Sequence, residues 1–378
     1  MSNEESANNR EFTVVMRGSS AVVFLQKENL FIEKFPSASG PVNIVYTSRW
    51  ISRGETVIVP GQLWIEIRGQ GKNLEESLVP FANAGLALLP ILALSANAAI
   101  EEPEVEVAFD STPSVSERDY FQCYVPPESG VVHFARHIDV KTTVALLDAI
   151  DRHSDAERLR RAANQYRLAL DSWKLGRATL SLAHLWMAIE ALTKAKIRFE
   201  CTTRGLSSEE ELANTLGVET NQLDSAIRRD FILYGDEECY KKSKQASDGF
   251  EHGFLGYDKI RELSKDVRYR MAKYIRNAIL ELSGLDAEPL RVLTSDPYDK
   301  PMGHWPVVKY VRGRLLGKSP ELAAKGNAYP YLRWKPVINK CEVTKDNKIN
   351  VQFSENFAAE FGDGISFQPS SYEAWKPE

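Results

Sequence analysis

The stretch Leu182-Ala-His-Leu-Trp-Met-Ala-Ile-Glu-Ala-Leu-Thr193 decides how the middle of this chain folds. It belongs to a segment from about residue 179 to residue 199 that would be apolar on nearly every side of a helix. Such a helix must be surrounded by other elements, so we expect it to be the central helix of a bundle. Glu190 interrupts the apolar run. If buried it would need a partner, for which Arg228 and Arg270 are candidates, and otherwise it would face solvent.

Helical periodicity continues on both sides of this segment. One predicted helix begins near Val140, a second follows Asp155, and the last long one runs from about Tyr257 to Ser283. Between them, a capping box formed by Ser207 and Glu210 predicts a short helix. Together these patterns predict a helical domain over residues 139–285, with a polar turn at 247–253 before its last helix.

Short runs rich in β-branched and aromatic residues flank the helical domain, and turn residues separate them. We expect a β-rich α+β domain over residues 11–135, after a disordered tail at 1–10. Residues 295–378 read as a β-rich C-terminal region that could pack on the N-terminal domain. The predicted fold class is therefore α+β, with a central helical bundle between two β-rich regions.

One uncharged segment, Ser77 to Ile100, is long enough to cross a membrane. Pro80 and Pro90 interrupt it, acidic residues flank it on both sides, and no Lys or Arg biases its orientation. We therefore predict a buried, proline-kinked core helix and no membrane span.

Composition narrows the class of protein further. A net charge of −5 argues against a surface that grips nucleic acid everywhere, although it leaves room for a local basic cleft. The 4 cysteines are widely spaced and form no C-x-x-C pair. The sequence thus predicts no metal and no cofactor, and a reducing cytoplasm as the compartment.

Several segments of the helical domain carry a family resemblance. Leu182–Thr193 is similar to the central helix of HEPN domains, especially the Apea-like branch. Leu212–Val218 and Phe231–Tyr234 resemble the stretch that follows it there, and Ser247–Gly253 stands where that family has its polar motif. The resemblance covers a domain-sized part of the chain. The whole chain also resembles uncharacterised proteins related to methylamine-utilisation protein J, which implies no activity.

The HEPN resemblance implies a candidate activity. Many HEPN domains are metal-independent ribonucleases whose motif is Arg, four to six residues, then His, paired across a homodimer. The Arg stabilises charge on the phosphate, and the His takes a proton from the RNA 2′-hydroxyl. His252 matches the family His, but Gln245, Ala246 and Ser247 occupy the positions where the Arg is expected. Without that Arg, His252 could instead serve only to shape a turn.

The candidate site residues follow from this resemblance. Catalytic candidates are His252, Asp248 and Glu251, although the two carboxylates could equally cap a helix. RNA-binding candidates are the nearby cations Lys244, Arg228, Arg229 and Arg261. Glu190 and His184 on the central helix could position the catalytic side chains without contacting RNA themselves, although His184 also suits a core or edge position.

Three functions remain open. The leading one is a cytoplasmic, homodimeric HEPN-like protein that binds RNA or nucleotide and could be a degenerate ribonuclease in stress or phage defence. The alternative is a non-catalytic dimeric scaffold. A third is a helix-turn-helix regulator that would present Asn221, Gln222, Ser225 and Arg229 to DNA, which acidic neighbours oppose.

Two further motifs have ordinary explanations. Gly313–Ser319 resembles a phosphate-binding loop but is one residue short between its glycines. His133 and His137 could share a helical face and a metal. The flanking valines and isoleucine favour extended chain there.

Overall fold

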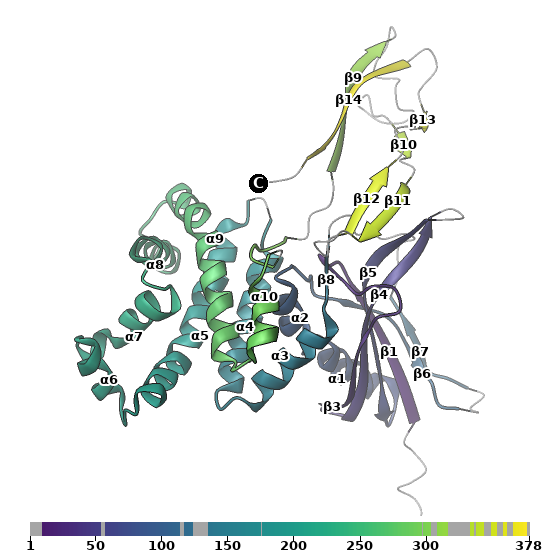
Figure 1. The fold of residues 1–378 in the computed structure, drawn as a ribbon. Helices are drawn as coiled ribbons and strands as arrows, with labels where there is room; N and C mark the ends of the chain where they lie inside the picture. Colours follow the sequence, from purple (N-terminus) through teal and green to yellow (C-terminus); the bar gives the residue numbers. More distant parts are fainter. Residues whose placement is uncertain are drawn as a thin grey trace, which may run out of the picture.

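The computed structural model describes residues 10–53, 57–113, 117–123, 135–174, 176–296 and 298–303, together with strands at 308–316, 333–335, 338–343, 349–353, 358–360 and 366–375. It has the predicted α+β architecture: a sheet, a helical bundle beside it and a group of C-terminal strands (Figure 1). The predicted tail lies outside the described residues, except that Arg10 already begins the first strand.

The N-terminal region forms a six-stranded antiparallel sheet of order β3-β4-β5-β1-β6-β7. Its strands are β1 (Arg10–Gly18), β3 (Leu30–Ser37), β4 (Gly40–Arg53), β5 (Val57–Gly71), β6 (Glu104–Asp110) and β7 (Tyr120–Gln122). The sequence predicts separate strands at residues 56–59 and 63–67, but one strand, β5, covers residues 57–71. β5 pairs with β4 on both sides of Pro60, and the register shifts between Ser48 and Trp50 of β4.

The apolar segment after the sheet folds into two helices, α1 (Leu74–Leu86) and α2 (Leu89–Ala96). A Cβ on Gly85 would lie 3.0 Å from Ile67 Cδ1, so this glycine lets α1 approach the sheet closely. By length and composition the span Leu74–Ala96 could cross a membrane, but 56% of its most apolar window is buried inside the structure. Buried residues of both helices belong to the hydrophobic core, as predicted, but the chain forms two helices where a single proline-kinked helix was expected.

The helical bundle follows the predicted pattern. Its principal helices are α3 (Val140–Arg152), α4 (Ala156–Asp171), α5 (Ala178–Arg204), α8 (Glu237–His252) and α9 (Tyr257–Leu282). The central helix α5 packs against α4, α8 and α9 (Figure 1). Shorter pieces complete the bundle: α6 (Glu209–Leu216), a 3-10 turn (Thr220–Gln222), α7 (Leu223–Ala226), a π-helical turn (Ile227–Ile232) and α10 (Ala287–Thr294).

Two local predictions were wrong. The expected polar turn at 247–253 is the last part of α8 and its C-cap, so the preceding helix was missed. Its buried stripe consists mostly of small residues (Cys239, Tyr240, Ser243, Ala246, Ser247 and Gly249), which give a weak hydrophobic signal. The capping box of α6 is displaced by one residue, because Ser208 accepts from the N–H of Glu211 at 3.2 Å and Glu211 accepts from the N–H of Ser207 at 2.7 Å.

The C-terminus of α2 is the point where sheet and bundle are joined. The guanidinium of Arg276, fully buried in α9, donates to the carbonyl oxygens of Leu94 at 2.9 Å and Ser95 at 3.1 Å, and to that of Leu293 in α10 at 2.8 Å. Arg136 donates to the carbonyls of Ala96 at 3.0 Å and Asn97 at 2.7 Å. The guanidinium groups of Arg136 and Arg276 thus donate to the last carbonyl groups of α2, where a helix has few N–H donors of its own.

Asn97 closes α2 in the left-handed region, at φ 48°. Its side chain accepts from the Tyr166 hydroxyl at 2.6 Å and donates to the Tyr298 carbonyl at 2.8 Å.

Burial lowers the pKa of Arg136 and of Arg276 to about 10. Both therefore remain charged near neutral pH, held by carbonyl dipoles.

The described C-terminal strands pair as β9 (Val308–Leu316) with β14 (Ser366–Trp375), β10 (Arg333–Lys335) with β13 (Ala358–Glu360), and β11 (Ile338–Val343) with β12 (Ile349–Phe353). β11 lies beside β5 of the N-terminal sheet (Figure 1). The sequence also predicts a short helix from Ser319 and a polar turn at residues 344–348, and both fall outside the described residues. The loop-like motif at 313–319 begins within β9 and its later part is also outside them.

We expect Arg276→Met to lower the free energy of unfolding by about 3 kcal/mol or more, because it removes the guanidinium that donates to three buried carbonyls. Arg291→Met is the matched control. Arg291 is 70% exposed and pairs with Glu288, so its loss should cost under about 0.5 kcal/mol. Urea unfolding followed by tryptophan fluorescence measures both. Equal losses in the two variants would contradict the role given to Arg276.

Candidate functional site

The helical hairpin of α8 and α9 positions the predicted site. Asp236 caps α8 by accepting from the N–H of Cys239 at 3.0 Å, and it also accepts from Arg270 at 3.0 Å and from the Tyr274 hydroxyl at 3.1 Å. One partly buried carboxylate therefore fixes the start of α8 against the middle of α9. Further along the pair, Lys242 of α8 donates to Asp266 of α9 at 2.5 Å.

The end of the hairpin is shaped by two glycines of the motif Ser247–Gly253. A Cβ on Gly249 would lie 2.7 Å from Leu255 Cδ1, so only glycine lets the returning chain pack against α8. Gly253 ends α8 in the left-handed region, at φ 69°. Part of this motif thus has a purely structural explanation.

His252 is the last residue of α8 and its side chain is exposed. Within the described ranges it makes no hydrogen bond or ion pair, so its imidazole is available to a ligand or partner. Around it Phe250, Phe254 and Tyr257 are 55%, 61% and 60% exposed. We call Phe250, His252, Phe254 and Tyr257 the hairpin tip.

The two predicted carboxylates are engaged along α8 itself. Asp248 accepts from Lys244 at 2.6 Å, and Glu251 accepts from the Ser247 hydroxyl at 2.9 Å. The hydrogen bond to Asp248 is the main cause that raises the pKa of Lys244. Both are contacts between residues four apart in one helix, and neither carboxylate contacts His252.

The predicted RNA-binding arginines are likewise paired with carboxylates. Arg261 lies 3.1 Å from Asp258, and Arg228 lies 3.8 Å from Glu190. Arg229 donates to Asp230 at 2.6 Å, which raises the arginine's pKa. The structure therefore brings none of these guanidinium groups into contact with His252.

Arg228 belongs to a cluster that the sequence did not indicate. Its guanidinium lies 5.8 Å from the centre of the Trp186 ring and donates to the Thr193 hydroxyl at 3.0 Å. Trp186 also packs against Tyr240 of α8 at a ring distance of 6.4 Å. Glu190 is not buried: its side chain is 49% exposed, and Arg228 is the ion-pair partner nearest to it among the two considered, at 3.8 Å. The isolated aromatic residues gave no periodic signal for this contact.

His184 is a half-buried residue at the edge of the bundle. Its Nδ1 lies 2.9 Å from Gln165 Oε1 on α4. Burial is the main cause that lowers its pKa. It belongs to the α4–α5 contact and not to the hairpin tip.

No group of three or more His, Cys, Asp and Glu side chains in the described part of the chain could hold a metal ion. His137 lies in the short strand β8 (Arg136–His137), and its Nε2 is 2.6 Å from Glu28 Oε2. The extended chain expected there is confirmed for His137, while His133 is outside the described residues.

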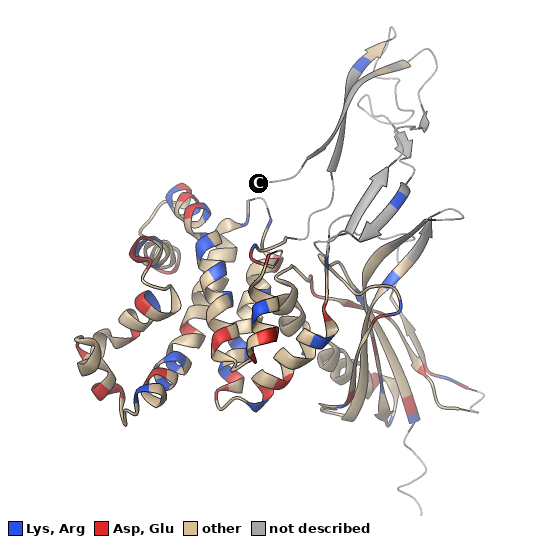
Figure 2. Ribbon diagram, in the orientation of Figure 1, with Lys and Arg blue, Asp and Glu red and all other residues tan. Residues whose placement is uncertain are grey.

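The segment considered as a helix-turn-helix contains α6, then short 3-10, α and π pieces in succession. Arg229, one of the four residues proposed to read bases, is held by Asp230 and lies 3.4 Å from Glu237. Basic and acidic residues are interspersed along the bundle helices, with no broad face of one sign (Figure 2). That distribution gives little support to binding dominated by phosphate contacts.

No protein-family model, no curated protein and no solved structure matches this chain. The resemblance of the bundle to HEPN domains therefore remains a prediction from its own residues.

We expect Asp236→Asn to reduce the acid sensitivity of the fold. Burial alone would raise the pKa of Asp236, but the Cys239 N–H, the Tyr274 hydroxyl and Arg270 together hold that pKa below its ordinary value. The stabilisation is therefore complete above the unfolded pKa of about 4 and is lost as pH falls through the lower folded pKa.

Unfolding free energies measured between pH 7 and pH 2 test this expectation. Asp236→Asn should cost about 1–2 kcal/mol at neutral pH and show a shallower decline in acid than the wild type. Asp258→Asn is the control, because that side chain is 89% exposed. A decline as steep in Asp236→Asn as in the wild type would refute the assignment.

Proposed function

We propose that this chain is a HEPN-like protein that works as a non-catalytic interaction module and forms a homodimer through the hairpin tip. The observation that carries the proposal is the exposure of Phe250, Phe254 and Tyr257 within eight residues of chain. Exposed aromatic clusters are typical of protein interfaces. A two-fold dimer would place the same tip of both copies at the contact.

The charges around the tip favour a protein partner over RNA. Lys244, Arg228, Arg229 and Arg261 each have a carboxylate partner within the same chain. These pairs leave no surplus of positive charge beside the aromatic side chains to attract an RNA phosphate. A second copy would need only to cover the aromatic side chains.

RNA binding, with or without cleavage, is the second candidate function. The observation that favours it is His252, which has no partner in the described structure and stands among aromatic side chains that could stack on bases. Transition-state charge on a phosphate would also need a cation. The positions Gln245, Ala246 and Ser247 supply none.

The cytoplasm is the compartment that we propose. Cys123, Cys201 and Cys239 are free thiols in the described structure. Burial is the main cause that raises the pKa of Cys239, to about 12, so this thiol is unreactive at neutral pH. Free thiols suit a reducing environment.

Phe254→Glu tests the dimer. We expect the wild type to sediment as a dimer, and the variant's dissociation constant to rise at least about 30-fold, the effect of losing a central aromatic contact. The matched control is Phe31→Glu on β3, since Phe31 is 53% exposed and lies away from the tip. A wild type that stays monomeric, or a Phe254→Glu variant that dimerises like the control, would refute the proposal.

His252→Ala tests the absence of catalysis. We expect a fluorescent single-stranded RNA to survive equally with the wild type and with the variant, because no arginine of the described residues hydrogen-bonds or pairs with His252. Gel analysis of the RNA over time measures this, and a variant purified in the same way controls for contaminating nuclease. Cleavage by the wild type that disappears in His252→Ala would establish the ribonuclease function instead.

A further inference from the structure

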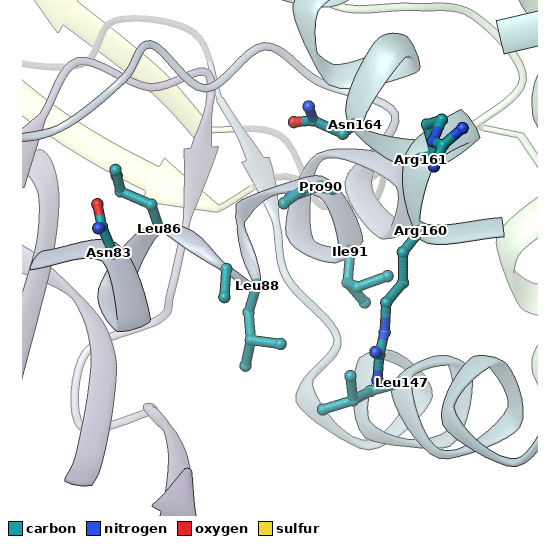
Figure 3. A pocket seen from close by; sticks show the side chains of 10 residues that line it. Asn83, Leu86, Leu88, Pro90, Ile91, Leu147, Arg160, Arg161 and Asn164 are labelled. Carbon is teal, nitrogen blue, oxygen red and sulfur yellow. The ribbon is translucent and has the colours of Figure 1, made fainter. Parts of the chain in front are cut away.

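A cavity lies where the N-terminal helices meet the bundle. Its volume is about 350 Å³, within the range of small-molecule sites. α1 and α2 form one side, and α3 and α4 form the other (Figure 3). It shares no residue with the hairpin tip.

The break between α1 and α2 creates this cavity. α1 ends at Leu86, the chain turns at residues 87–88, and α2 starts with Pro90 in its first turn. A proline suits that position but cannot continue a preceding helix. The two helices therefore form a corner that α3 and α4 do not fill.

The wall of the cavity is mainly apolar, with a polar rim. Leu86, Leu88, Pro90 and Ile91 come from the corner, and Leu147 comes from α3. The opposite rim carries Arg160, Arg161 and Asn164 of α4, and in Figure 3 the Arg160 side chain extends along the cavity towards Leu147.

Arg160 and Arg161 are the charged residues among those that line the cavity. Arg160 donates to Asp151 at 2.5 Å and Arg161 donates to Glu157 at 3.2 Å. The side chains of both acids are exposed, 45% and 88% respectively. Surface ion pairs of this kind contribute little, so either guanidinium can turn to a ligand at small cost.

We propose that this cavity binds an aliphatic monocarboxylate of roughly 10–15 non-hydrogen atoms, the size that fills such a volume at protein packing density. The carboxylate lies at Arg160 and Arg161, which suit planar two-oxygen recognition. The alkyl chain covers Leu86, Leu88 and Ile91. An inorganic anion would leave this apolar wall uncovered, and an alkyl cation would meet Arg160 and Arg161, whose partners Asp151 and Glu157 are not among the residues that line the cavity.

The test is isothermal titration of the full chain with octanoate, octylammonium and inorganic phosphate. We expect octanoate to bind and the other two to bind at least about 10-fold more weakly, since each lacks one half of the recognition. Arg160→Ala/Arg161→Ala should weaken octanoate binding about 10- to 100-fold, as expected for lost charge-assisted hydrogen bonds. Arg158→Ala, on the same helix but outside the cavity wall, should bind as the wild type does.

Leu86→Trp fills the cavity without removing charge and should also abolish octanoate binding, with a far-ultraviolet circular dichroism spectrum like that of the wild type. Three results would overturn the proposal. They are no octanoate binding by the wild type, equal binding of octylammonium, and unchanged octanoate binding in both the double arginine variant and Leu86→Trp.

Discussion

The structure depends on how the last carbonyl groups of one buried helix are satisfied. α2 lies between the sheet and the bundle with all of its residues buried, so water cannot reach its end. Arg276 reaches it from α9 and Arg136 from the segment before α3. A guanidinium has five donors and can serve several carbonyls at once, which lysine cannot do in the same fixed geometry. The same contacts orient α9, and through it the hairpin that carries the tip.

Charge pairing decides what the hairpin can do. A cation near His252 would favour phosphate chemistry, but the cations proposed for that task are bound to Asp248, Glu190, Asp230 and Asp258. Such pairs are weak individually, yet together they leave the region without a surplus of positive charge. Phe250, Phe254 and Tyr257 are exposed, and this exposure favours the proposed contact with another protein over contact with RNA.

The tip and the cavity are built from different elements and can be altered separately. The tip belongs to α8 and α9, whereas the cavity belongs to the corner of α1 and α2 and to α3 and α4. A ligand in the cavity would contact both the N-terminal helices and the bundle, and binding would stabilise that junction. This offers the N-terminal region a role beyond covering the core.

The sequence by itself determined the α+β class, the helical bundle, its central helix and the proline break before α2, because hydrophobic period and proline geometry are local properties. It missed α8, whose buried face is mostly small residues. It marked His252 by resemblance but could not show which carboxylate holds each arginine. Only the tertiary structure decided the pairing of Arg228 with Glu190, the two arginines at the end of α2 and the cavity, since each joins residues far apart in the chain. Arg276 and Leu94, 182 positions apart, meet only once the bundle has closed on the sheet.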